Sequence, residues 1–212
     1  MYVKVLSLKL QFNQQIELNM KMEDYLKEVE FAIIPILKAI WHEDAELQFA
    51  QTRYRELIKK VIEQDKTTQM LGKNMFASKD IKALDLAGNE NKTLKQRIAT
   101  RHFAIAALSG ALLQFAKQGI SIVHSGLDNC PSGPFIGSQP LKEILWNARN
   151  QSFHWEEKKL NPKVKNCFRN LSIEFGFTSF GMFHSSNMAY SVIKLLGWKT
   201  SEDFKAIMLC LR

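Results

Sequence analysis

Three residues near the middle of the chain have types and spacing that could do chemistry together. Arg149, Asn150 and His154 lie in the six-residue stretch RNQSFH. On a helix, Asn150 and His154 are one turn apart and share a face, and Arg149 flanks them at about 100° from Asn150. An arginine presents a permanently charged fork that fits phosphate oxygens, and a histidine exchanges a proton near neutral pH. This pattern favours chemistry on a phosphate group.

Cleavage of RNA without a metal needs these residue types. The ribose 2′-OH must lose a proton, attack the adjacent phosphorus and expel the 5′-oxygen, which must gain a proton. His154 is the expected acid or base, a role that typically contributes about 10² to 10⁴ in rate. Arg149 would hold the phosphate and stabilise the charge that grows on it, and Asn150 would orient the imidazole or the substrate. We expect these three to be the catalytic residues.

The stretch fits R-x4-H with a polar residue directly after the arginine, and in this it resembles the signature of the HEPN superfamily. The spacing occurs again at 97–102, RIATRH, but there Ile98 follows the arginine where the family pattern has a polar residue. The resemblance covers the motif, the helical character of the chain and the long helix before the motif. It implies a helical bundle, metal-independent ribonuclease activity that leaves 2′,3′-cyclic phosphate ends, and a homodimer whose two motifs face each other. It points to toxin and phage-defence systems.

Two other interpretations of the motif stay open. One is a non-catalytic HEPN-like module that binds nucleotide or RNA, or that scaffolds a partner. The other is purely structural, with Arg149 and His154 satisfied inside a buried polar network that holds a bundle together.

The helix that must position the motif is expected at about 141–160. Its apolar stripe at helical spacing predicts the core face. This stripe consists of Leu141, Ile144, Leu145, Ala148, Ser152 and Trp155. Trp146 and Phe153 fall on the opposite face, with the motif. Because a helix that is apolar all round is usually buried on both sides, we expect this second face to contact another layer of the chain or the partner in a homodimer.

Further cations are expected to bind the substrate. Lys158 and Lys159 open a basic cluster beyond the motif, which is either a track for the RNA backbone or a soluble helix end. The cluster continues with Lys163, Lys165 and Arg169. Arg101 stands on an otherwise apolar helical face, so it either snorkels outward or faces a polar site together with His102. His102 or His124 could supply a second imidazole for the second proton transfer.

Composition sets the class of protein and of partner. The chain has 212 residues, of which 46% are hydrophobic, so we expect one domain over 1–212 with a sizeable core. A net charge of +8 favours anionic partners such as RNA, although it equally fits a generally basic soluble protein. The three cysteines lack CxxC spacing, and GxGxxG and GxxxxGK[ST] loops do not occur in the sequence. No metal and no cofactor are expected. The sequence predicts no signal peptide and no apolar run of membrane-spanning length, hence a cytoplasmic protein without a membrane partner.

The expected fold is mainly α: a HEPN-like bundle of long, kinked helices with a small two-stranded β appendage. Alternating apolar residues predict the two strands at 3–12 and 171–177. Apolar steps of three and four predict long helices over 22–61, with a kink at Pro35, and over about 94–115.

The remaining segments are assigned by their turn residues. Between the long helices, 65–92 is polar and rich in Gly and Asn, with a short helix at 78–87. A long Gly- and Pro-rich loop is expected at 119–140. Two helices close the chain at 187–196 and 202–211, and Thr200 or Ser201 is the predicted cap of the last one.

Overall fold

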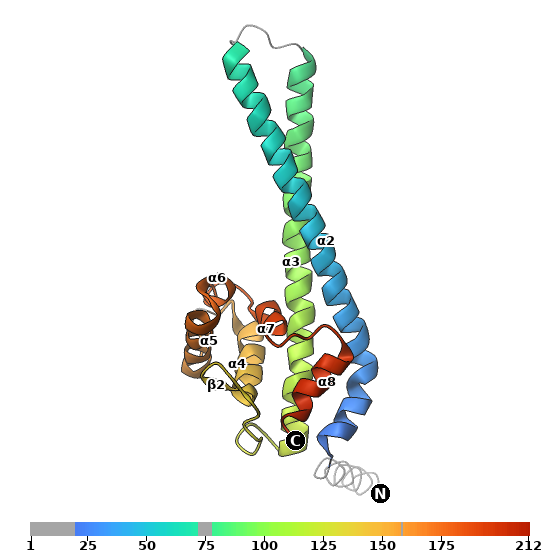
Figure 1. The fold of residues 1–212 in the computed structure, drawn as a ribbon, viewed down its shortest axis with the longest axis vertical. Coiled ribbons are helices and arrows are strands. Elements are labelled where there is room, and N and C mark those ends of the chain that lie inside the picture. The colour runs from blue at the N-terminus through green and yellow to red at the C-terminus, as the bar shows by residue number, and fades with distance from the viewer. Residues whose placement is uncertain (1–19, 72–77, 158) are drawn as a thin grey trace, which may run out of the picture. The chain divides into compact units, whose positions relative to one another are not determined.

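The computed structural model describes residues 20–71, 78–157 and 159–212. This part of the chain is mainly helical, which confirms the predicted class (Figure 1). Its elements are α2 (Met22–Leu71), α3 (Ser78–His124), β1 (Phe135–Ile136), β2 (Gln139–Pro140), α4 (Leu141–His154), α5 (Pro162–Phe175), α6 (Phe177–Phe180), α7 (Ala189–Leu195) and α8 (Ser201–Leu209). The chain divides into two compact units. The first holds the described residues before 40 and those from 106 onward, and the second holds 40–105. The expectation of a single domain stays a prediction.

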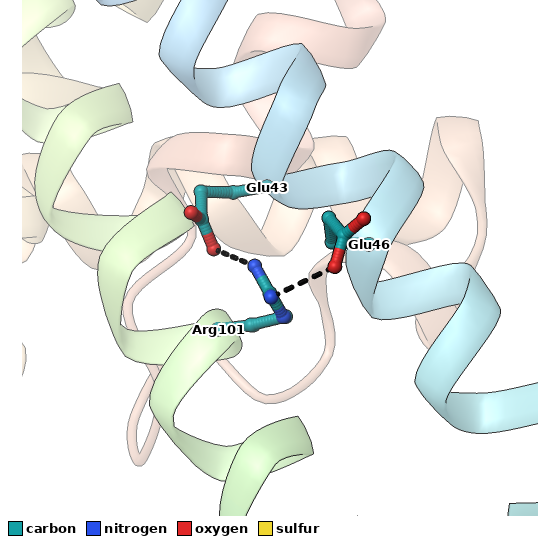
Figure 2. A network of polar contacts seen from close by, with 3 residues as sticks. All are labelled: Glu43, Glu46 and Arg101. Atoms are coloured by element: carbon teal, nitrogen blue, oxygen red, sulfur yellow. Dashed lines mark hydrogen bonds and ion pairs between the residues drawn. The ribbon is translucent and has the colours of Figure 1, made fainter.

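The second unit is a helical hairpin made of the later part of α2 and the earlier part of α3. Arg101 of α3 donates from Nη1 to Glu43 at 2.7 Å and from Nη2 to Glu46 at 2.9 Å (Figure 2). Further along the hairpin, Arg53 of α2 pairs with Glu90 of α3, so the two helices run antiparallel. Glu43 and Arg101 each interrupt the apolar stripe of their own helix. The hydrogen-bonded ion pair between them accounts for both interruptions. Charge-assisted hydrogen bonds of this kind are about twice as strong as neutral ones.

The core of the first unit is organised around the last part of α3. Leu112, Leu113, Ala116 and Ile120 are fully buried there. The hydroxyl of Tyr25 on α2 donates to the carbonyl of Phe115 at 2.6 Å. A Cβ at Gly119 would lie 2.8 Å from Cε1 of Tyr25, so the absence of a side chain at Gly119 permits this contact. From the other end of the chain, the buried Met208 of α8 reaches the same glycine.

The preceding loop holds the start of α4. The backbone N–H of Leu141 donates to the carbonyl of Pro134 at 2.9 Å, which satisfies one of the N–H groups that a helix leaves free at its start. Lys142 donates from Nζ to the carbonyls of Leu127 and Cys130 and so ties the loop to the first turn. This loop is shorter than expected, because α3 continues to His124.

The predicted core face of α4 is confirmed except at its end. Leu141, Ile144, Leu145, Ala148 and Ser152 are buried, but Trp155 is only partly buried. The predicted extension to residue 160 is wrong, because α4 ends at His154 and a turn follows, in which the N–H of Glu157 donates to the carbonyl of His154.

The strand predicted at 171–177 is wrong, because this segment belongs to α5 and α6. In α5 the residues at helical spacing are buried, namely Val164, Cys167, Phe168 and Leu171. The apparent alternation came from Ile173 and Phe175, which are exposed. The other predicted strand, 3–12, lies outside the described residues. A two-stranded antiparallel hairpin does exist within the part of the chain that the structure describes, but it is formed by β1 and β2.

The long helices are longer than predicted. Pro35 lies inside α2, which continues to Leu71. The segment 78–92, expected to be a short helix followed by turns, is the first part of α3, which runs through Gly88. The last two helices lie close to their predicted positions. Thr200 is confirmed as a cap, and it exchanges hydrogen bonds with Asp203 in a capping box.

One stretch of helix meets the length and composition of a membrane span. It is Gly88–His124, so the expectation that no apolar run reaches this length is corrected for the residues the structure describes. Of its most apolar window, 44% is buried inside the structure, and the core helix of a soluble protein passes the same test.

Candidate functional site

Arg149 lies half-buried on α4, where neutral groups hold its guanidinium. Its Nε donates to Oε1 of Gln114 on α3 at 2.5 Å. Its Cζ lies 4.3 Å from the centre of the Phe153 ring, one turn later on α4, which is within the range of a cation–π contact. These two contacts fix the orientation of the guanidinium but leave its charge uncompensated.

A second cation reaches the motif from α3. Nζ of Lys117 donates to Oδ1 of Asn150 at 3.2 Å, and Nη1 of Arg149 donates to the same oxygen at 3.5 Å. Lys117 also lies over the Trp146 ring, with Nζ 4.3 Å from its centre. Two positive groups therefore converge on one amide oxygen. We define Lys117, Arg149 and Asn150 as the cation cluster.

The electrostatics of the cation cluster favour an anion. Among the described residues, no carboxylate lies within ion-pair distance of Lys117 or Arg149. Burial, and in second place the charge of Arg149, lower the pKa of Lys117 below its ordinary value. Both effects disfavour the charged amine, and the negative charge of a bound anion would offset them.

His154 is the last residue of α4 and one turn beyond Asn150. Its side chain is 50% exposed, and its Nδ1 lies 2.5 Å from Oε1 of Glu157. A carboxylate at Nδ1 favours the tautomer with its proton on that nitrogen, which leaves the lone pair of Nε2 free to accept a proton. Among the described contacts, no hydrogen bond joins His154 to Arg149.

The opposite side of the motif is a buried polar network that fixes α4. Gln151 is fully buried; its Nε2 donates to the carbonyls of Phe183 and Ser186, and its Oε1 accepts from the N–H of Met188. Asn187 donates from Nδ2 to the carbonyl of Ser152. These bonds anchor the segment 183–188 on α4. This buried polar network is made by Gln151 and Ser152, whereas Arg149 makes its own part-buried hydrogen bonds to Gln114 and Asn150.

The other predicted substrate contacts are not members of the cation cluster. Arg101 and His102 belong to the second unit, where two carboxylates engage Arg101 and Nε2 of His102 lies 3.5 Å from Nε2 of Gln51. Lys159 is exposed, and Lys158 lies outside the described residues. The buried Nε2 of His124, at the end of α3, has no hydrogen-bond partner among the described residues.

Sequence reasoning missed Lys117 and Gln114. A local signal existed, because the two are polar and one turn apart on a helix whose adjacent residues, Leu113 and Ala116, are apolar and buried. Polar residues placed at this spacing face one neighbour. Which neighbour they face depends on the fold.

Comparison of the chain with known protein families, with curated protein sequences and with solved structures gives no match. Within the part of the chain that the structure describes, no group of three or more His, Cys, Asp or Glu side chains is placed to hold a metal ion.

Proposed function

We propose that this protein is a HEPN-type endoribonuclease that cuts RNA without a metal and leaves 2′,3′-cyclic phosphate ends. The observation that carries the proposal is the uncompensated positive charge of Arg149, held beside Asn150, which lies one helical turn from the exposed imidazole of His154. Phosphate binding needs the positive charge of Arg149, and proton transfer needs the imidazole of His154.

Each residue has a distinct role in this reaction. Arg149 holds a non-bridging phosphate oxygen and stabilises the negative charge that grows on it during attack. His154, with Glu157 at Nδ1, accepts the proton of the 2′-OH at Nε2. Asn150 positions the phosphate through the amide that faces both cations. Lys159 and, in the second unit, Arg101 and His102 remain proposed substrate contacts.

A second imidazole is needed to protonate the leaving 5′-oxygen, so the proposal includes a homodimer. Its interface is the face of α4 that carries Trp146, Phe153 and the motif. The exposure of Phe153, a residue that is 49% accessible, supports a contact with another chain at this place. We propose that the dimer acts in the cytoplasm, in a toxin or phage-defence system, without a membrane partner.

The test is RNA cleavage in the presence of a chelator by the full-length protein and its variants. His154→Ala is expected to lower the cleavage rate by about 10² or more, because it removes the proton acceptor. Arg149→Ala should lower it similarly, because it removes the charge that stabilises the transition state. The products should carry cyclic phosphate ends, detected by their resistance to 3′-end ligation and to phosphatase until acid opens the ring, after which phosphatase removes the monophosphate and ligation succeeds.

Two matched variants control for surface changes elsewhere in the same unit. His184 is exposed and its ring lies against Phe183, so His184→Ala removes an imidazole without touching the motif. Arg212→Ala removes a guanidinium at the C-terminus that pairs with Glu23. Both should cleave like the wild type. An inert wild type, or unchanged cleavage by Arg149→Ala and His154→Ala, would contradict the proposal.

A second candidate function is binding of nucleotide or RNA without cleavage. It is favoured by the separation of the two parts of the site, since the cation cluster has no described hydrogen bond to His154. If the wild type retains RNA without cutting it, and Arg149→Ala releases the RNA while His154→Ala does not, this second function holds in place of the first.

A further inference from the structure

We infer that Lys117 of α3, which is not part of the R-x4-H motif, is a second phosphate-binding residue and contacts the same RNA phosphate as Arg149. The inference rests on the proposed function, in that RNA is the ligand. It deepens that proposal by assigning half of the phosphate site to a different helix.

The first argument is the contrast with two other part-buried cations of this chain, each of which is paired with at least one carboxylate. Arg101 is held by the carboxylates of Glu43 and Glu46, and Lys205 of α8 is paired with Glu30 of α2. Lys117 and Arg149 share only the neutral oxygen of Asn150. Two partly desolvated charges of the same sign without a counter-charge are costly, and an anionic ligand supplies the missing charge.

The second argument is distance. Nζ of Lys117 and Nη1 of Arg149 both lie within 3.5 Å of one oxygen atom, so a single phosphate group is large enough to contact both nitrogen atoms. Lys117 uses one of its three protons on Asn150 and has two left for a ligand. The guanidinium likewise has free N–H groups beyond those that face Gln114 and Asn150.

The third argument is orientation. The Trp146 ring lies under Nζ of Lys117, and the Phe153 ring lies under the guanidinium of Arg149, each at 4.3 Å. These rings restrict two flexible side chains before the ligand arrives, which reduces the entropy lost on binding. The arrangement costs the free protein stability, because the two charges repel, and this cost is recovered when phosphate binds.

The experiment uses full-length Lys117→Gln and a mixed-sequence single-stranded RNA that is fully 2′-O-methylated, so that it carries phosphates but cannot be cut. Dissociation constants are measured across a series of salt concentrations, together with thermal midpoints. Losing one phosphate contact should reduce the steepness of log K against log salt by about 0.7, which weakens binding about fivefold at 0.1 M salt. The midpoint of the free variant should equal or exceed that of the wild type.

Lys194→Gln is the matched control. Nζ of Lys194 lies 4.7 Å above the Tyr190 ring in the same unit, so this change also removes a charge and a cation–π contact. Its affinity and salt dependence should match those of the wild type. Lys117→Arg should restore most of the salt dependence, because it restores the charge.

The outcomes separate this inference from the proposed function. A wild type that binds and cuts RNA, beside a Lys117→Gln variant with unchanged affinity and salt dependence, overturns the role of Lys117 and leaves the ribonuclease intact. A large drop in the thermal midpoint of Lys117→Gln also overturns it, because that result assigns Lys117 to the core. A wild type that neither binds nor cuts RNA overturns both.

Discussion

At the scale of single residues, the motif RNQSFH has two sides with different tasks. Arg149, Asn150 and His154 face outward or lie half-buried, whereas Gln151 and Ser152 are buried and hold other parts of the chain. The type and spacing of the outward residues identified the candidate site from sequence. Their partners could not be identified in the same way, because Gln114 and Lys117 precede Arg149 and Asn150 by 35 and 33 positions. A local pattern carries no information at that separation.

The three cysteines provide a residue-scale check of the fold. Burial raises the pKa of the Cys130 thiol to about 11 and that of Cys167 to about 12, whereas Cys210 is exposed. Because the thiolate is the reactive form, only Cys210 should react quickly with a disulfide reagent at pH 8. Titration of the native protein should detect one fast thiol, and titration in denaturant should detect three. Two or more fast thiols would contradict the packing of the first unit. So would a Cys167→Ser variant that lacks the fast thiol, because that result would assign the fast reaction to Cys167.

At the scale of elements, prediction succeeded where one signal dominated. Thr200 and Asp203 mark the start of α8 by capping chemistry, and the apolar stripe of α4 marks its core face. It failed in α5, where the apolar but exposed Ile173 and Phe175 gave the sequence an alternating pattern that is typical of a strand. It also failed at the start of α3, since Gly88 and its neighbours have turn-like composition. α3 nevertheless continues through these residues, because helix propensity is a weak preference that tertiary context often overrides.

Two glycines of α3 give opposite predictions for the same substitution. A Cβ at Gly88 would meet no atom within 4 Å, so Gly88→Ala should raise the free energy of unfolding by about 0.5–1 kcal/mol through helix propensity. A Cβ at Gly119 would meet Tyr25 at 2.8 Å, so Gly119→Ala should lower it by about 1–3 kcal/mol through overpacking.

Chemical denaturation followed by far-ultraviolet circular dichroism measures both changes. Each variant is the control for the other, since the helix and the substitution are the same. A stabilising Gly119→Ala would mean that Tyr25 does not pack against α3 as described. A destabilising Gly88→Ala would argue against a continuous α3 at that position.

At the scale of the whole molecule, the sequence predicted a mainly helical, basic protein but did not predict two compact units. The reason is that α2 and α3 each contribute residues to both units, so the helical pattern continues across the division. Composition does not change at residue 40 or 105, and no linker separates the units in sequence. Only long-range contacts reveal the division.

The proposed homodimer leads to a prediction about mixed subunits. Wild-type and His154→Ala chains with different tags are co-expressed, and the mixed dimer is purified by both tags. If each cleavage event needs an imidazole from both subunits, the mixed dimer should have far less than half of the wild-type cleavage rate. Independent sites would give one half. A wild type that sediments as a monomer in analytical ultracentrifugation at assay concentrations would contradict the composite site.

The buried hydrogen bonds of Gln151 affect how loss-of-function screens of this helix should be interpreted. If the proposed toxic ribonuclease activity holds, a screen that scores survival of an expressing host would register Gln151 and His154 as equally intolerant, although Gln151 maintains the docking of 183–188 and His154 faces solvent. Soluble yield separates the two classes, because a misfolded chain disappears from the lysate while a folded but inactive chain accumulates. Intolerant positions in α4 therefore identify reactive groups only after abundance has been taken into account.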